Sequence, residues 1–181
     1  MKTNYIKLIL MVVCAGFLTG CASPATVQGM RPQSLALQNR HSYSVNVQAA
    51  GGRNTNPLWT SEISDDAFVN AIRESIATSG LFRSVIAAGS GDYLLEVIII
   101  NVDKPLIGLD LTVNLTANWK LTHIPTGKVV YQELILKHYT ATFGDSAVAI
   151  KRLRLAEEGA ARKNIEEGLT QLSRLNLQGN E

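Results

Sequence analysis

The chain has 181 residues, of which 46% are hydrophobic and 18% charged, with 17 Lys and Arg against 15 Asp and Glu. Two of the basic residues, Lys2 and Lys7, lie in the first 20 positions, which hold no acidic residue, so the rest of the chain is formally neutral. Neutrality without a concentrated basic stretch argues against a nucleic-acid partner, and about 160 residues suit a single domain with a core of its own.

The first 20 residues have the three-part layout of a secretory signal peptide. Lys2 and Lys7 make the beginning positive, and positions 6–17 form an almost unbroken apolar run. That run is shorter than the roughly 20 residues that span a bilayer as a helix. We therefore interpret residues 1–20 as a leader that is removed.

The leader closes on the tetrapeptide Leu18-Thr19-Gly20-Cys21. It resembles the lipobox of bacterial lipoproteins, in which Leu, a small residue and Gly precede the cysteine. The resemblance implies that diacylglycerol is attached to the Cys21 thiol, that the chain is cut before Cys21 and that the new N-terminus is acylated. This covalent lipid would hold the protein on a membrane, because two or more acyl chains anchor stably. No other cofactor is expected.

Ala22 follows the predicted lipid site where an Asp would favour retention in the inner membrane. Ala in place of Asp at this position resembles the pattern of lipoproteins sorted to the outer membrane, where the domain would face the periplasm. Cys14 would leave with the leader and Cys21 would carry lipid, so we expect no disulfide within the mature chain.

The next segment, 22–40, contains Pro24, Gly29 and Pro32 and has little periodicity, which is typical of a flexible linker. We expect residues 21–42 to be the lipidated N-terminus and a flexible tether that lifts the domain off the membrane. Residues 43–177 are then one periplasmic domain, and 178–181 a disordered tail.

Local patterns predict the elements of that domain in chain order. Strands are expected at 43–48, 81–86 and 93–102 because of their alternation or their β-branched content. A helix is expected between Ser64, which suits the N-cap, and Gly80, which suits the position after the C-cap. A last helix is expected from a cap at Asp145-Ser146 to about residue 175. Gly159 and Gly168 inside it are explained by a close approach of the helix to the sheet.

The clearest pattern is the alternation of apolar and polar residues over 109–122. It predicts a strand with one buried and one solvated face, and the turn at 124–127 predicts a hairpin with 129–143. A four-residue turn makes the sum of paired residue numbers odd. That register would bury Leu134 and Leu136 and leave the charged neighbours Glu133 and Lys137 in solvent, where charges cost least.

This order of elements predicts an α+β fold of two layers: a mainly antiparallel sheet of about four to five strands with two helices packed on one face. The layout over roughly residues 43–175 resembles that of small periplasmic lipoproteins. Examples are the lipopolysaccharide-assembly lipoprotein and the auxiliary lipoproteins of lipid-transporting ABC systems. No motif selects one of these families.

Motifs for catalysis or metal binding are missing from the sequence. His41, His123 and His138 are scattered and lack the spacing of zinc ligands. There is neither a Gly-x-Ser-x-Gly elbow nor a phosphate-binding Gly-Lys-Thr loop. We therefore expect no catalytic residues, no metal and no enzymatic activity.

Two groups of side chains are candidates for partner binding. Arg53 and Trp59 lie in the loop 51–59, and both residue types are favoured anchors at interfaces, although Trp59 also suits packing over the sheet edge. Lys151, Arg152 and Arg154 begin the last helix. Their side chains form either a solvated face or a surface for anionic headgroups or another protein.

A third candidate is the polar face of the strand at 109–121, which carries Thr112, Asn114, Thr116 and Asn118. It is either an ordinary solvated sheet face or an open face that receives a partner. The leading interpretation is a membrane-anchored, non-catalytic accessory or docking component of an envelope system for lipid transport or assembly. The alternatives are an envelope-modifying enzyme with an unrecognised site and a subunit of an oligomeric outer-membrane pore.

Overall fold

The computed structural model describes residues 22–55, 60–86, 89, 91–105 and 107–177. The predicted leader, the predicted lipid site Cys21, Trp59 and the predicted tail at 178–181 lie outside the described residues. In chain order the elements are α2 (Val27–Met30), β1 (His41–Ala50), α3 (Asp65–Ser79), β2 (Phe82–Ile86), β3 (Tyr93–Asp103), β4 (Leu111–His123), β5 (Lys128–Ala141) and α4 (Ala149–Ser173).

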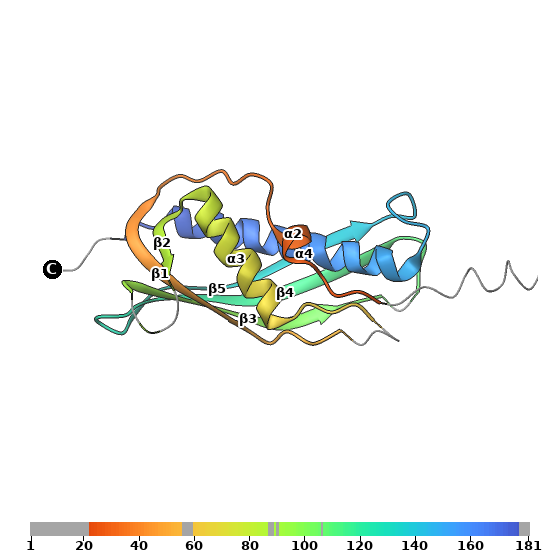
Figure 1. The fold of residues 1–181 in the computed structure, drawn as a ribbon, viewed down its shortest axis with the longest axis horizontal. Helices are drawn as coiled ribbons and strands as arrows, with labels where there is room; N and C mark the ends of the chain where they lie inside the picture. Colours follow the sequence, from red (N-terminus) through yellow and green to blue (C-terminus); the bar gives the residue numbers. More distant parts are fainter. Residues whose placement is uncertain (1–21, 56–59, 87–88, 90, 106, 178–181) are drawn as a thin grey trace, which may run out of the picture.

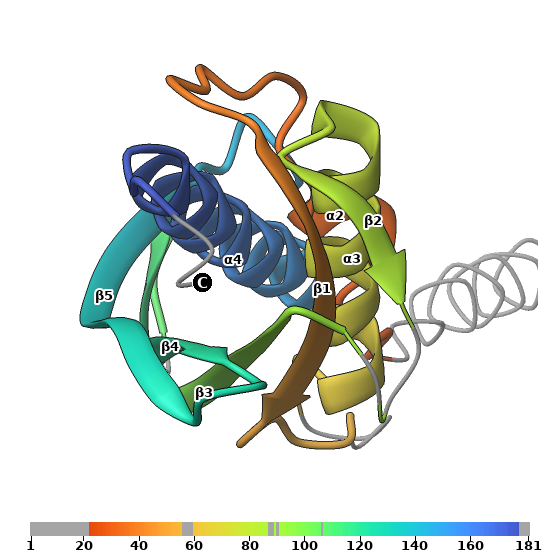
Figure 2. The same cartoon turned by 90° about the vertical axis from the view of Figure 1, so that its left-hand side faces the viewer.

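The strands form one five-stranded sheet in the order β2-β1-β3-β4-β5. The sheet curls around α4, and α3 packs beside α4 against β1 and β2 (Figures 1 and 2). The α+β class and the number of strands are confirmed. The sheet is mixed, because β1 pairs in parallel with both β2 and β3 while β3, β4 and β5 are antiparallel. Parallel pairing of β1 with β2 is possible because α3 carries the chain back along the sheet.

Helix α3 has the predicted ends. The Ser64 hydroxyl accepts a hydrogen bond from the Ala67 amide at 3.2 Å, and Gly80 adopts a left-handed conformation with φ of 64°. The Gly80 amide donates to the Ile76 carbonyl, as expected after a helix C-cap. None of the helices in the described part of the chain combines the length and the hydropathy needed to cross a membrane.

Helix α4 begins later than predicted, with Val148 at the N-cap. Asp145 does not cap it, because its carboxylate accepts hydrogen bonds from the Thr142 amide at 2.7 Å and hydroxyl at 2.9 Å. These bonds hold the pKa of Asp145 below its usual value. The explanation for the glycines of α4 is confirmed: a Cβ at Gly159 would overlap the Tyr139 ring, and one at Gly168 would lie 2.6 Å from the Trp119 indole.

The register of β5 on β4 differs from the prediction. Thr122 pairs with Val129 next to the turn, as an odd sum requires, but Leu121 pairs with Tyr131. The extra residue, Val130, is a β-bulge that shifts the remaining pairs by one. The predicted burial of Leu134 and Leu136 is therefore wrong, and both lie on the side of the sheet away from the helices.

The shifted register does not bury uncompensated charge. Glu133 and Lys137 lie on the helix side, but β5 is an edge strand, so both side chains reach beyond the core. Glu133 is exposed, and the Lys137 ammonium lies 2.8 Å from the Glu167 carboxylate on α4. Ile135 takes the buried position between them.

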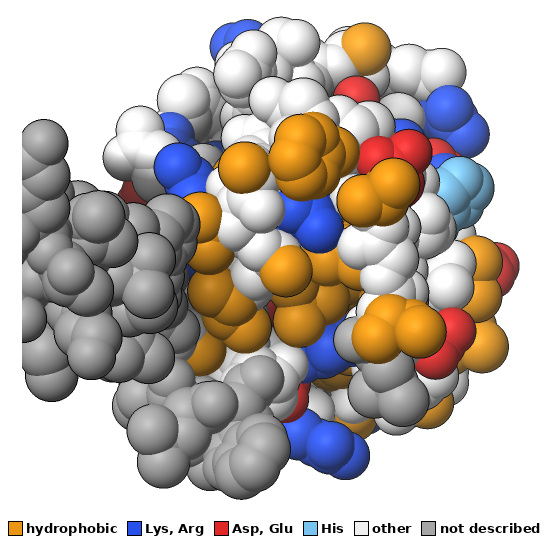
Figure 3. Space-filling model, turned by 90° about the vertical axis from the view of Figure 1, so that its right-hand side faces the viewer, with side chains coloured by type: hydrophobic (Ala, Val, Ile, Leu, Met, Phe, Trp, Pro, Cys, Tyr) orange, Lys and Arg blue, Asp and Glu red, His pale blue; other side chains and the backbone are white. Residues whose placement is uncertain are grey.

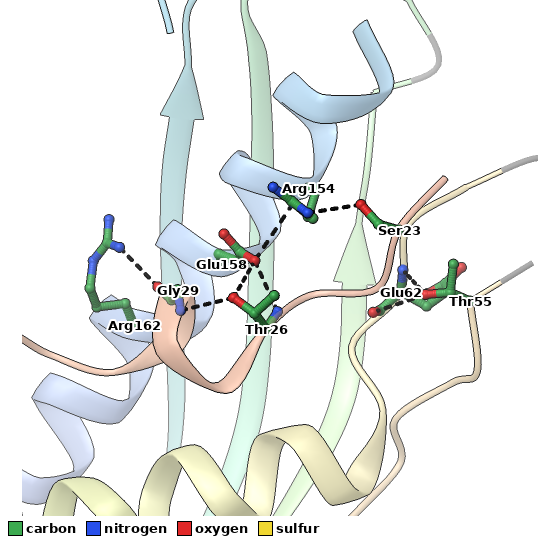
Figure 4. A network of polar contacts seen from close by, with 8 residues as sticks. All are labelled: Ser23, Thr26, Gly29, Thr55, Glu62, Arg154, Glu158 and Arg162. Atoms are coloured by element: carbon green, nitrogen blue, oxygen red, sulfur yellow. Dashed lines mark hydrogen bonds and ion pairs between the residues drawn. The ribbon is translucent and has the colours of Figure 1, made fainter. Parts of the chain in front are cut away.

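The segment predicted to be a flexible tether is packed against the domain. Ala22, Ala25 and Met30 are buried. The amide and hydroxyl of Thr26 both donate to the buried Glu158 carboxylate of α4 at 2.9 Å (Figure 4). The domain thus begins by residue 22, rather than at 43. The periodicity is missing because the segment contains only the single helical turn α2, and separate residues on either side of that turn fill the rest of the space over α4.

Candidate functional site

The side of the sheet away from the helices carries exposed aliphatic side chains on two strands, β3 and β5, which flank β4. Leu134 and Leu136 of β5 are 62% and 60% exposed, and they stand opposite the half-buried Asn118 and Thr116 of β4. On the other side of β4, Ile98 of β3 pairs with Asn118. Ile98 and Ile100 are 40% and 58% exposed. We call Ile98, Ile100, Leu134 and Leu136 the outer apolar face.

Polar pairs border the outer apolar face at both ends. Toward one end of the strands Lys120 and Glu96 form an ion pair at 2.6 Å. Toward the other end lie two hydrogen-bonded pairs of side chains, Thr112 with Thr140 and Asn114 with Asp103. The two aliphatic pairs flank the polar Thr116 and Asn118 of β4, and exposed apolar side chains with a polar rim are common at protein–protein interfaces.

Sequence reasoning found half of this surface. The four polar positions of β4, Thr112, Asn114, Thr116 and Asn118, do face outward as the alternation indicates. Leu134 and Leu136 were missed because the prediction placed them in the core. The hydropathy of β5 carries no signal for the bulge, so only the paired strands reveal it.

The predicted basic cluster on α4 is divided by the fold. Lys151 is exposed, whereas Arg154 is half-buried and donates to the Ser23 hydroxyl at 2.8 Å. Arg152 is only 3% exposed, and its guanidinium donates to the backbone carbonyls of Ser146, Ala147 and Gly108. The prediction that Arg152 contacts a partner is corrected, because a buried guanidinium already bonded to three carbonyls cannot meet one. Arg53 is exposed and lines the same surface pocket as Ile100 of the outer apolar face.

A second candidate site, which is polar, lies within the domain near the beginning of α4. Lys104 contacts two carboxylates, Glu62 at 2.7 Å and the fully buried Glu157 at 2.5 Å, and it donates to the Ser61 carbonyl. The Glu157 oxygens have no partner with hydrogen-bond geometry, so the ion pair is close but poorly directed. Beside it, a cavity of about 450 Å³ is lined in part by Arg53, Glu62 and Lys104.

Burial raises the pKa of Glu157 to about 7, although Lys104 opposes the shift. The site can therefore hold a proton near neutral pH. No group of His, Cys, Asp and Glu in the described part of the chain could hold a metal ion. We interpret the Lys104 site as structural, because Lys104 links three parts of the fold. It directly follows β3, and it contacts Glu62 in the segment before α3 and Glu157 on α4.

Replacing Glu157 by Gln should change the pH dependence of stability. Between about pH 4.5 and pH 7 the folded protein keeps a proton that the unfolded chain has lost, so the contribution of Glu157 to stability falls as pH rises through this range. The loss is at most about 3 kcal/mol. Urea unfolding across this range should give a flatter profile for Glu157→Gln than for the wild type. Gln at the exposed Glu166 should leave the profile unchanged, and equal slopes for all three would contradict this assignment.

No family model matches the sequence, and no curated protein matches it. Solved structures share its fold. A DUF330-family protein from Xanthomonas campestris is 14% identical, with a TM-score of 0.59, covering 78% of this chain and 89% of that one. A hypothetical protein from Chlamydia trachomatis is 10% identical, with a TM-score of 0.54, covering 73% and 96%.

A candidate lipoprotein from Caulobacter crescentus CB15 is 14% identical, with a TM-score of 0.50, covering 71% of this chain and 87% of that one. At these identities the similarity is one of fold. It shows that this α+β fold occurs in one protein described as a candidate lipoprotein, and the names of these three neighbours indicate no enzymatic activity.

Proposed function

We propose that this chain is a lipoprotein of the bacterial cell envelope, held by lipid on Cys21 in the outer membrane and facing the periplasm. It acts there without catalysis, as an accessory that docks a protein component of a lipid-transport or assembly system. The lipobox-like tetrapeptide and the fold shared with a candidate lipoprotein support the anchor.

The docking role rests on one observation, the outer apolar face. Leu134 and Leu136 place two isobutyl groups in solvent on the edge strand β5, on a sheet face that the helices leave open. Covering such side chains removes apolar area from water, at about 25 cal/mol for each Å². The polar rim would then fix the orientation of the partner.

Removing the two leucines should abolish docking without unfolding the domain. We expect the double variant Leu134→Ser, Leu136→Ser to lose at least about tenfold in partner capture, because a few apolar anchors carry most of the binding energy of an interface. The melting temperature should change little, since both side chains are exposed. Capture is measured by crosslinking the full-length lipidated protein in cells, followed by a detergent pull-down and mass spectrometry of proteins and lipids.

The matched control is Ile124→Ser with Val129→Ser, which removes two exposed apolar side chains at the turn end of the β4–β5 hairpin, away from Leu134 and Leu136. This control should capture the same partner as the wild type. Equal capture by the Leu134 and Leu136 variant would remove the docking role from the outer apolar face. A specific lipid in place of a protein among the captured molecules would redirect the proposal to lipid handling.

A further inference from the structure

A second group of exposed apolar side chains lies at one end of the domain. Ile107 and Leu109, in the loop between β3 and β4, are 89% and 74% exposed. Phe143 and Val148, between β5 and α4, are 54% and 53% exposed. We call these four residues the apolar tip. Figure 3 looks onto this end of the molecule, where hydrophobic side chains spread across the surface with single basic side chains between them.

Arg152 holds the two loops of the apolar tip together. Its guanidinium donates to the Gly108 carbonyl of one loop at 3.2 Å and to the Ser146 carbonyl of the other at 2.7 Å, and it lies 5.6 Å from the centre of the Phe143 ring. The Phe143 amide also donates to the Asp110 carboxylate of the first loop. These contacts tie the backbones of the two loops together, and the four apolar side chains of the tip are exposed on them.

The described chain begins at the same end (Figure 1). The Ser23 hydroxyl accepts a hydrogen bond from Arg154, two residues beyond Arg152 on α4, and the Ala25 amide donates to the Glu62 carbonyl at 3.1 Å. Ala22 is only 8% exposed. Cys21 directly precedes Ala22 in the sequence, and consecutive Cα atoms of a chain are about 3.8 Å apart. Hardly any free chain therefore separates the predicted lipid from the domain.

We propose that the apolar tip inserts into the lipid bilayer beside the lipid of Cys21, so that the domain stands directly on the membrane. The inference rests on the lipid anchor of the proposed function. Interfacial apolar side chains of this kind lie about 5–10 Å deep, at the boundary of headgroups and acyl chains. Exposed Lys151, on the first turn of α4, would lie near lipid phosphates. The outer apolar face would then stand upright and open to a periplasmic partner.

The test uses the full mature lipidated protein and measures how deeply the apolar tip lies in the lipid bilayer. Ile107→Cys, labelled with an environment-sensitive fluorophore, is reconstituted into vesicles of phosphatidylethanolamine and phosphatidylglycerol with or without brominated acyl chains. The introduced thiol is available for labelling because Cys14 leaves with the leader and Cys21 carries lipid. Ile124→Cys at the opposite end is the control, and both side chains are exposed, so folding should be preserved.

We expect a blue shift and a loss of emission in brominated vesicles for the label at 107, and neither for the label at 124. Flotation with the vesicles reports the anchor separately. Flotation without quenching at 107, or with equal quenching at both positions, would overturn the docked orientation and leave the anchor intact. Failure to float would overturn the anchor itself, and the orientation with it.

Discussion

Replacing Gly168 by Val should destabilise the domain by about 3 kcal/mol, because the added side chain has no space between α4 and the sheet. Even a single Cβ would lie 2.6–2.7 Å from three atoms of the Trp119 ring. That ring is fully buried, and its Nε1 donates to the Asn164 side chain at 2.9 Å, so it cannot turn aside without breaking a buried hydrogen bond. Removing a helical glycine, which alone would stabilise the helix by up to about 1 kcal/mol, cannot offset this overlap.

Thermal unfolding checks this expectation, as a loss of this size lowers the melting temperature of a domain this large by roughly 10 °C. Gly144→Val is the matched control, since Gly144 is exposed and a Cβ there would come no closer than 3.4 Å to the Thr142 hydroxyl. Its stability should stay within about 0.5 kcal/mol of the wild type. A Gly168→Val protein as stable as the control would mean that Trp119 does not set the spacing of helix and sheet.

Replacing Cys21 by Ser should abolish lipid attachment and, with it, the stable membrane association of the protein. A serine hydroxyl cannot form the thioether, so the variant should be released or should remain unprocessed with its leader. Loss of acyl chains, each held by about 0.8 kcal/mol for every buried CH₂, removes the anchor entirely. Metabolic lipid labelling, the mass of the mature chain and membrane fractionation measure the three consequences.

The other cysteine of the sequence provides the control. Cys14→Ser lies in the predicted leader and should preserve labelling, processing and fractionation. Survival of lipid labelling in Cys21→Ser would disprove the lipid site at Cys21. Loss of labelling in Cys21→Ser with no change in its fractionation would instead assign membrane attachment to other parts of the protein.

Local sequence determined the elements of this fold. Ser64 and Gly80 mark the ends of α3 because a cap and a left-handed residue satisfy backbone groups within one turn. The alternation from Leu111 to Leu121 determined which face of β4 is buried, because successive side chains of a strand point to opposite sides. The polar half of the candidate docking surface was predictable for the same reason.

Contacts between distant parts of the chain decided the rest. The bulge at Val130 decided that Leu134 and Leu136 face solvent, and it is visible only in the pairing of β5 with β4. Glu158 and Arg162 of α4 decided that residues 22–40 lie on the domain, through hydrogen bonds to Thr26 and Gly29 across more than 130 positions of sequence. Such contacts depend on where two elements meet, which no local pattern of hydropathy or turn residues encodes.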